Sequence, residues 1–323
     1  MLPNFDYVRP GSAKDAIKHL SSDGARIHAG GTDLLNCLRD GVYGANKVVS
    51  LSKITALKGI KESGGGLRIG AMTTIAEVAG NATVKERYPA LAQAAATVAS
   101  PQLRNQGTIG GNICQRPWCW YFRGGYTCIR KGGDTCYAVG GENQYHAIFG
   151  SEGICHIVHP SDTAPALMAL GASVAITGRR GGRRVALDKF FVGPGEDAQR
   201  ETVLQADEIV TEIVLPAPAG GLKSSYRKVR ERQAFDFALA GVALALQMGG
   251  GKVSAASVVL SGAAPVPWRS EATEKALLGK RLDARTIAKA AEAAVKGAEP
   301  MDNNAYKVPL FKGIIEEELT KMA

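Results

Sequence analysis

The residues best suited to chemistry in this sequence are its 6 cysteines, most of which crowd into one stretch. Cys37 stands apart, and the others are Cys114, Cys119, Cys128, Cys136 and Cys155. A chain of 323 residues buries a large core without covalent staples, so this crowding needs a chemical reason. Clustered thiols form disulfides, hold zinc or hold an iron–sulfur cluster, and each implies a different function.

The spacing of the cysteines disfavours zinc and favours a cluster. None of the intervals is the C-x2-C pair common in structural zinc sites and bacterial ferredoxins. Four thiolates can hold an iron–sulfur cluster at irregular spacing when a flexible loop wraps round it. The segment contains Gly124-Gly125, Gly132-Gly133 and Gly140-Gly141, which provide that flexibility, and Arg123, Arg130 and Lys131, which offset the cluster's negative charge. An exposed loop of unpaired thiols is the alternative, and it leaves the crowding unexplained.

The N-terminal residues argue against disulfides. Residues 1–6 contain neither a basic region nor an apolar run, so no signal peptide is visible. We therefore expect a reducing, cytoplasmic location, where clustered cysteines more often bind metal or do redox work. A periplasmic location would require export in complex with a partner that carries a signal.

Two glycine-rich turns predict a site for an anionic ligand. His28-Ala29-Gly30-Gly31-Thr32-Asp33-Leu34 lies where a strand turns into a helix, and Gln106-Gly107-Thr108-Ile109-Gly110-Gly111-Asn112 is similar. Glycines let backbone N–H groups approach an anion closely, so two such turns could hold a pyrophosphate from two sides. The spacing is not the Rossmann dinucleotide fingerprint. In a third element, His159-Pro160-Ser161-Asp162, Ser161 caps a helix or Asp162 accepts bonds from a cofactor's hydroxyls, and the sequence leaves both readings open.

Short strands and helices alternate around these turns. We expect a helix from Ser12 to Ser22, strands at 26–29, 46–51 and 67–71, and alanine-rich helices between Thr73 and Ser100, interrupted at Pro89. The cysteine segment carries no sustained periodicity. A helix at 164–170 and a strand at 172–177 follow it. After the Pro/Gly stretch 216–221, we expect strands at 224–230, 238–247 and 252–260, then helices at 270–278, 283–296 and 312–322. This order predicts an α+β protein.

Composition limits the function classes. The formal net charge of +9 invites a nucleic-acid hypothesis, but the basic residues are scattered and lack interleaved aromatics, so we expect no nucleic-acid binding. A basic surface also suits an anionic cofactor, an acidic partner subunit or an acidic electron carrier. No apolar stretch is long enough for a membrane span.

Taken together, these motifs resemble a known family. The turn at 28–34, the turn at 108–112 and Ser161-Asp162 resemble the FAD-binding medium subunit of molybdenum hydroxylases, the xanthine dehydrogenase and carbon monoxide dehydrogenase family. The resemblance covers essentially the whole chain, including Tyr226-Arg227-Lys228-Val229-Arg230 and Asp236-Phe237-Ala238. It implies a PCMH-type (vanillyl-alcohol-oxidase-like) FAD-binding domain over 1–219, and a CO dehydrogenase flavoprotein C-terminal-like domain over 222–323.

Ordinary members lack a cysteine insertion, which here spans 113–156. Residues 115–123 and 146–150 look like the insertion of the 4-hydroxybenzoyl-CoA reductase and periplasmic aldehyde oxidoreductase types, whose FAD subunit carries an additional [4Fe–4S] cluster. The resemblance implies the ligands Cys119, Cys128, Cys136 and Cys155. Cys114 is then a non-ligand, and it is the first replacement if one assignment fails.

The resemblance also implies how FAD is held. Two turns would cradle the pyrophosphate, with residues Ile27, His28, Ala29, Gly30, Gly31, Thr32, Asp33, Leu34, Thr108, Gly110, Gly111 and Asn112. Asp162 would contact the ribityl or ribose region. Lys228 would lie near the flavin ring, where its charge could stabilise an anionic reduced flavin. A surface lysine on a strand is the alternative for Lys228.

By this resemblance the chain is the electron-transfer subunit of a heterotrimeric oxidoreductase. A molybdopterin-containing large subunit would transform the substrate, a [2Fe–2S] small subunit would relay electrons, and FAD would exchange them with an external acceptor or donor. No catalytic acid, base or nucleophile is expected in this chain. Two alternatives remain: a stand-alone FAD reductase of the UDP-N-acetylenolpyruvoylglucosamine reductase type, and a zinc-stabilised scaffold.

Overall fold

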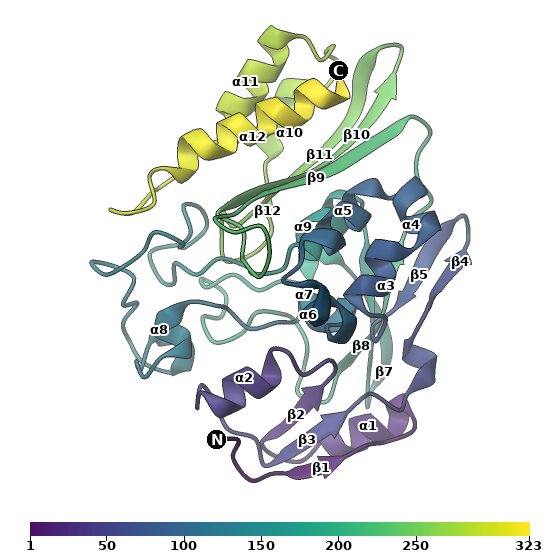
Figure 1. Cartoon of the computed structure of the whole chain (residues 1–323), viewed down its shortest axis with the longest axis vertical. Coiled ribbons are helices and arrows are strands. Elements are labelled where there is room, and N and C mark those ends of the chain that lie inside the picture. Colours follow the sequence, from purple (N-terminus) through teal and green to yellow (C-terminus); the bar gives the residue numbers. More distant parts are fainter.

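Three β-sheets organise the chain, and the computed structural model describes all residues from 1 to 323. The first is a small parallel sheet with the strand order β1 (Asp6–Val8), β3 (Lys47–Ser50), β2 (Ala25–His28). The second is antiparallel, in the order β4 (Ile60–Ser63), β5 (Gly66–Gly70), β8 (Ile209–Leu215), β6 (Ser173–Gly178), β7 (Gly181–Ala186). In Figure 1 the first sheet lies at the bottom of the molecule and the second rises beside it.

Short helices connect these two sheets, and their side-chain caps explain where they begin. The helices are α1 (Ala13–Leu20), α2 (Leu34–Arg39), α3 (Ile75–Gly80), α4 (Ala82–Arg87), α5 (Pro89–Thr97), α6 (Pro101–Gln106), α7 (Ile109–Ile113) and α9 (Thr163–Ala169). Ser12 accepts the Asp15 N–H at the start of α1, and Thr74 forms a reciprocal capping box with Glu77 at α3. Pro89 is the first residue of α5, where its missing N–H costs nothing. Single-turn 3-10 helices are η1 (Thr55–Leu57) and η3 (Leu187–Lys189).

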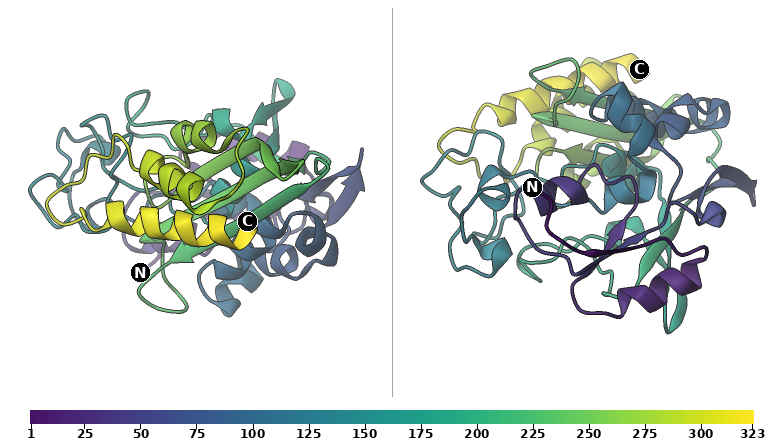
Figure 2. Two further views of the ribbon diagram at one scale, coloured as in Figure 1. Left: turned by 90° about the horizontal axis from the view of Figure 1, so that it is seen from above. Right: turned by 60° about the horizontal axis from the view of Figure 1, so that its bottom comes forward.

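The third sheet belongs to the C-terminal part of the chain. It contains β9 (Leu222–Val229), β10 (Ala240–Gly249), β11 (Lys252–Ser261) and β12 (Trp268–Arg269), in the order β12-β11-β10-β9. Helices α10 (Glu271–Leu277), α11 (Ala284–Ala294) and α12 (Lys307–Met322) lie across one face, as Figures 1 and 2 show. Helices α5 and α9 pack on the other face. Residues 216–221 connect β8 with β9.

Strand β10 shows why this sheet is buried on both faces. Val242, Leu244 and Leu246 belong to the core under α11 and α12, whereas Ala243 and Ala245 belong to the core shared with α5 and α9. Successive side chains of a strand point to opposite faces, so an unbroken apolar run suits a strand covered on both sides. The small alanines allow the helices on that face to approach closely.

The cysteine segment is an irregular insertion that follows helix α7 and precedes helix α9. Between residues 113 and 156 it contains only α8 (Trp120–Arg123) and the single-turn 3-10 helix η2 (Ile129–Lys131). Its end is fixed to the C-terminal part, since Asn304 Nδ2 donates to the carbonyls of His146 and Ala147. The buried ammonium of Lys307 donates to the carbonyls of His146, Tyr145 and Gly262, and burial lowers the pKa of Lys307 to about 7.

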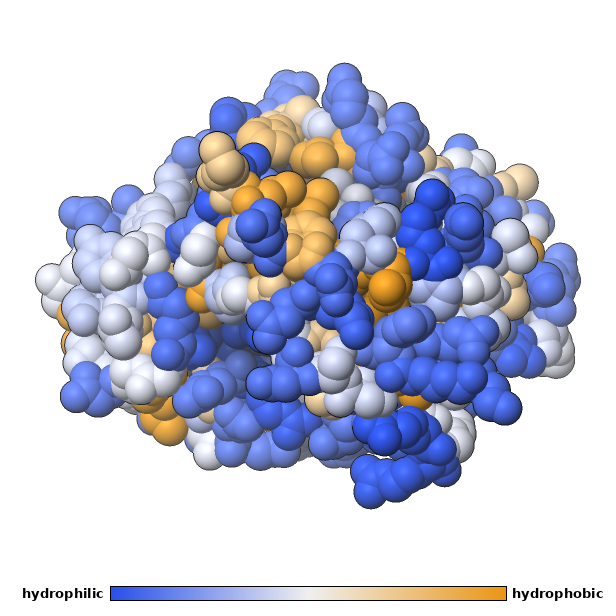
Figure 3. All heavy atoms as spheres, turned by 90° about the horizontal axis from the view of Figure 1, so that it is seen from below, coloured by the Kyte–Doolittle hydropathy of each residue, from blue (hydrophilic) through white to orange (hydrophobic).

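The structure confirms the α+β class and most expected elements. The unexpected strands are β1, β4, β7, β8 and β12. The expectation that the last helix begins at residue 312 was wrong: α12 begins at Lys307 and carries Pro309 in its first turn, where the ring is tolerated. None of the helices combines the length and apolar character that crossing a bilayer requires. The face seen from below is mostly hydrophilic, with apolar side chains in a few patches (Figure 3).

Candidate cofactor sites

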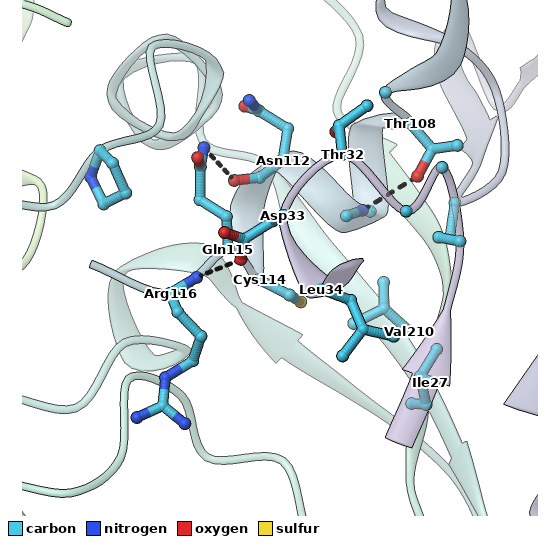
Figure 4. A pocket seen from close by; sticks show the side chains of 18 of the residues that line it. Ile27, Thr32, Asp33, Leu34, Thr108, Asn112, Cys114, Gln115, Arg116 and Val210 are labelled. Atoms are coloured by element: carbon cyan, nitrogen blue, oxygen red, sulfur yellow. Dashed lines mark hydrogen bonds between the residues drawn. The ribbon is translucent and has the colours of Figure 1, made fainter. Parts of the chain in front are cut away.

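A cavity of about 780 Å³ lies where the parallel sheet, α2, α7 and β8 meet. Both glycine-rich turns line it, together with the following predicted residues: Ile27, Ala29, Gly30, Gly31, Thr32, Asp33, Leu34, Thr108, Gly110, Gly111, Asn112 and Asp162. The lining also includes the apolar residues Leu20, Leu51 and Ile209 and the aromatic residues Trp118, Phe235 and Phe237. Figure 4 shows residues of both turns, including Thr32 and Thr108, side by side at the cavity.

The first turn offers free backbone donors. None of the N–H groups from residue 30 to residue 34 donates a hydrogen bond within the protein. A Cβ on Gly30 would lie 2.1 Å from the carbonyl oxygen of Gln106, so only glycine fits where the two turns meet. Gly31 has a φ of +77°, a conformation that L side chains rarely adopt. Successive unpaired N–H groups in such a turn form a concavity for an anion.

Hydrogen bonds from neighbouring side chains fix the second turn. Thr108 Oγ1 accepts the N–H of Gly111, and a Cβ on Gly110 would lie 2.7 Å from that of Ala71. Asn112 Oδ1 accepts hydrogen bonds from Ser161 and Thr163, both at 2.6 Å. These bonds tie the second turn to the start of α9.

Ser161 and Asp162 take different parts in the third element. Ser161 Oγ accepts the N–H of Ala164 and so caps α9, as the structural reading of this motif expected. Asp162 lines the cavity, and each of its carboxylate oxygens accepts one hydrogen bond from the protein. Tyr226 donates to Oδ1 and Lys228 to Oδ2, both at 2.8 Å.

Two predicted residues lie outside the cavity lining. Lys228 is 1 % exposed and forms an ion pair with Asp162, while its Nζ also donates to the carbonyls of Asp236 and Thr97. His28 turns its ring toward the edge of Tyr7, and burial lowers its pKa. The place of Lys228 near a flavin ring therefore stays a prediction.

Several lining residues were not predicted because they come from the cysteine segment. Cys114, Gln115, Arg116 and Trp118 all line the large cavity. The backbone N–H of Arg116 donates to Asp33, and the amide of Gln115 donates to the carbonyl of Asn112 (Figure 4). Their position directly after the second turn could have indicated this, since the residues that follow a binding turn in the chain lie beside the ligand.

A second, much smaller cavity collects the remaining cysteines of the segment. Cys119, Cys128, Cys136 and Cys155 line it, together with Arg130 and His146. All six cysteines of the chain are free thiols. No group of three or more His, Cys, Asp or Glu side chains is arranged to hold a metal ion. A cluster is larger than a single ion, so its ligands stand farther apart than those of zinc.

The thiols of this cavity differ in acidity. Hydrogen bonding to Cys155 lowers the pKa of Cys136 to about 5, and the same interaction raises the pKa of Cys155. Burial raises the pKa of Cys119 to about 11, and His146 Nε2 lies 3.3 Å from its Sγ. Cys114 lines the large cavity instead, and burial raises its pKa to about 12.

Of the three cations expected to offset a cluster's charge, only Arg130 lines the cysteine cavity. It is buried and forms an ion pair of 2.6 Å with Glu201, whose pKa burial raises. Arg123 pairs with Asp33 at 2.6 Å, and Lys131 donates to the carbonyl of Gly124.

Both predicted cofactors suit the residues present. The large cavity combines unpaired N–H groups, two glycines whose place a larger residue could not take, and apolar and aromatic lining residues. This combination suits a dinucleotide with a flavin ring. The small cavity brings together four free thiols and a buried cation, which suits a thiolate-ligated cluster.

Comparisons with protein families agree across the whole chain. Residues 3–218 match the FAD binding domain in molybdopterin dehydrogenase. Residues 224–317 match the CO dehydrogenase flavoprotein C-terminal domain.

Individual relatives cover nearly the full length of the chain. It is 33% identical over 322 residues to the aldehyde oxidoreductase FAD-binding subunit PaoB of Escherichia coli K12, which covers 98% of both chains. It is 31% identical to the carbon monoxide dehydrogenase medium chain of Hydrogenophaga pseudoflava, over 93% of this chain and 89% of that one.

Solved structures give the same result. Carbon monoxide dehydrogenase from H. pseudoflava, in a form lacking the Mo-pyranopterin moiety, matches with a TM-score of 0.78 and 30% identity, covering 98% of this chain and 96% of that chain. Quinoline 2-oxidoreductase from Pseudomonas putida 86 matches with a TM-score of 0.78 and 28% identity, covering 99% and 97%.

Proposed function

The chain belongs to the family of FAD-binding medium subunits of molybdenum hydroxylases, and from this premise we propose that it carries a [4Fe–4S] cluster beside its FAD. It is an oxidoreductase subunit, and substrate chemistry in this family takes place in a partner subunit. The proposed units are residues 1–219, with the insertion at 113–156, and residues 222–323.

In this proposal the large cavity holds FAD by its two glycine-rich turns. The unpaired N–H groups of residues 30–34 donate hydrogen bonds to the pyrophosphate oxygens. The second turn contributes Thr108, Gly110, Gly111 and Asn112 to the same site. The apolar lining residues Leu20, Leu51 and Ile209 suit the adenine ring. Flavins supply one- and two-electron transfer, and the surrounding residues bind and orient the ring.

Asp162 and Lys228 act together at this site. Tyr226 donates to one oxygen of the Asp162 carboxylate and Lys228 to the other, and these two bonds hold the carboxylate in a fixed orientation at the cavity. This orientation suits an acceptor of hydrogen bonds from the ribityl or ribose hydroxyls. Lys228 itself lies outside the lining, and its part at the site is to hold the Asp162 carboxylate in place.

The proposed ligands of the cluster are Cys119, Cys128, Cys136 and Cys155. The observation that carries this proposal is the separation of the thiols: these four line one small cavity, whereas Cys114 faces the large one. The buried guanidinium of Arg130 offsets part of the negative charge that four thiolates bring.

The proposed partners follow from the relatives. Two of them are medium chains of carbon monoxide dehydrogenase and one is an FAD-binding subunit of aldehyde oxidoreductase. We infer a molybdopterin-containing large subunit and a [2Fe–2S] small subunit, with FAD exchanging electrons with an external acceptor or donor. A stand-alone FAD reductase would not need the C-terminal CO dehydrogenase flavoprotein domain.

Cysteine variants of the full chain, purified without oxygen, test the ligand assignment. Cys128→Ser and Cys136→Ser should lose the broad visible absorption and bound iron of a cluster and keep the flavin bands. Cys114→Ser is the matched control and should keep both. Loss of iron in Cys114→Ser with retention in Cys136→Ser would refute the assignment, and bound zinc in place of iron would support a scaffold instead.

A further inference from the structure

Asp33 is a negative charge in a turn that is built to bind an anion. It lies between Thr32 and Leu34, whose N–H groups have no partner in the protein, and it lines the large cavity. Its side chain is 23% exposed, so part of it stays in contact with solvent. An unpaired carboxylate at this place would repel a bound diphosphate.

Both oxygens of Asp33 are engaged by the cysteine segment. Oδ1 receives Arg123 Nη2 at 2.6 Å, and Oδ2 receives the backbone N–H of Arg116 at 2.8 Å (Figure 4). Arg123 lies in α8, four residues after Cys119, and 90 positions along the chain from Asp33.

The guanidinium of Arg123 is fixed on every side. Its Nε donates to the carbonyl of Pro117 at 2.7 Å, Nη2 donates to that of Arg116 at 3.1 Å, and Cζ lies over the Trp118 ring, 4.1 Å from its centre. Nη1 lies 2.9 Å from Cys37 Sγ, one turn into α2. With 10% of its side chain exposed, Arg123 holds its charge beside Asp33 with little freedom to move away.

A second path of charges runs between the same two cavities. Arg116 Nε lies 3.0 Å from Glu201, and Glu201 pairs with Arg130 in the cysteine cavity. Arg116 itself lines the large cavity. Arginines of the cysteine segment therefore pair with both carboxylates: Arg123 with Asp33, and Arg116 and Arg130 with Glu201.

From this geometry we propose that Arg123 is a positioning residue for the flavin site, which neutralises Asp33 and holds the 29–34 turn ready for the diphosphate. The cysteine segment is then a structural part of the FAD site as well as the carrier of thiols. This inference rests on the proposed placement of FAD in the large cavity.

Affinity for FAD, measured by the quenching of flavin fluorescence on the full chain, tests it. Arg123→Met should weaken FAD binding about tenfold or more, because Asp33 is left unpaired beside the diphosphate. Adding Asp33→Asn removes the stranded charge, so the double variant should recover most of the affinity. Arg123→Lys keeps the charge but lacks the planar guanidinium with its several N–H donors, so its affinity for FAD should lie between those of the wild type and Arg123→Met.

Lys131→Met is the matched control, since Lys131 is also a cation of the segment but donates only to the carbonyl of Gly124. It should bind FAD as the wild type does. The affinity lost in Arg123→Met should also shrink as ionic strength rises, because salt screens the repulsion.

A merely structural role of Arg123 gives a different result. In that case Asp33→Asn would not rescue Arg123→Met, and salt would leave the loss unchanged, which would overturn the inference. Should Arg123→Met fail to fold, Asp33→Asn alone remains decisive, because a large loss of FAD in that variant contradicts the role assigned to the carboxylate. A wild-type chain without FAD would refute the proposed function itself, whereas full affinity in Arg123→Met refutes only this inference.

Discussion

Replacing Lys228 with methionine tests the buried ion pair that joins the two parts of the chain at the cavity wall. Lys228 and Asp162 have side chains 1% and 5% exposed, and their N–O distance is 2.8 Å. Methionine keeps the length of the side chain and removes its charge and its donors. Asp162 then keeps only the hydroxyl of Tyr226, and the carbonyls of Thr97 and Asp236 lose a donor.

The expected effect is large because one member of a buried pair is removed. Stranding a buried charge costs about 3–5 kcal/mol, and neither side chain is exposed enough for solvent to screen it. At about 2 °C per kcal/mol for a chain of this size, the midpoint of thermal unfolding should fall by about 6–10 °C. Adding Asp162→Asn removes the stranded carboxylate and should restore part of that loss.

The assay is thermal unfolding of the FAD-loaded full chain, followed by circular dichroism and by flavin fluorescence. Lys223→Met, an exposed lysine on the same strand with one carbonyl partner, is the control and should cost less than about 1 kcal/mol. An equally small effect of Lys228→Met, or a double variant less stable than the single one, would refute the reasoning.

Two further outcomes follow from glycine packing and from a buried histidine. Gly30→Ala should lose most bound flavin, because its Cβ would lie 2.1 Å from the Gln106 carbonyl oxygen. Gly44→Ala is the control and should bind flavin normally, since Gly44 has open space around it. Equal flavin content in the two variants would contradict the requirement for glycine at position 30. Burial, aided by Arg130, lowers the pKa of His159 to about 3, so the unfolded state binds more protons between pH 6.5 and pH 3. The free energy of unfolding should therefore fall by about 2 kcal/mol from pH 7 to pH 5, which is followed as a fall in the midpoint of thermal unfolding. A His159→Gln variant with the same pH dependence would show that another group is responsible.

Local patterns predicted most of the fold. Ser12, Thr74 and Pro89 mark helix starts by short-range chemistry that a sequence displays directly. Strands β4 and β8 were missed because their pairing with β5 is set by tertiary contacts: β8 comes from a distant part of the chain, and β4 is largely exposed with no apolar alternation.

The candidate sites were predictable as far as their residues are neighbours in sequence. The glycine turns, including Gly30 and Gly110, line one cavity, and their glycines were visible in the sequence because close approach of backbone requires glycine. The ion pairs Lys228–Asp162 and Arg123–Asp33 join residues 66 and 90 positions apart. No local pattern specifies such a pair, so the charges were visible in the sequence and their partners were not.

Chemical analysis of the full chain, purified without oxygen, tests the central claim most directly. Its bound FAD, iron, acid-labile sulfide and zinc are measured per polypeptide. We predict about one FAD, about four iron atoms, about four sulfides and no zinc. FAD without iron and sulfide, or zinc in their place, would contradict the account of a flavin subunit with a second redox centre.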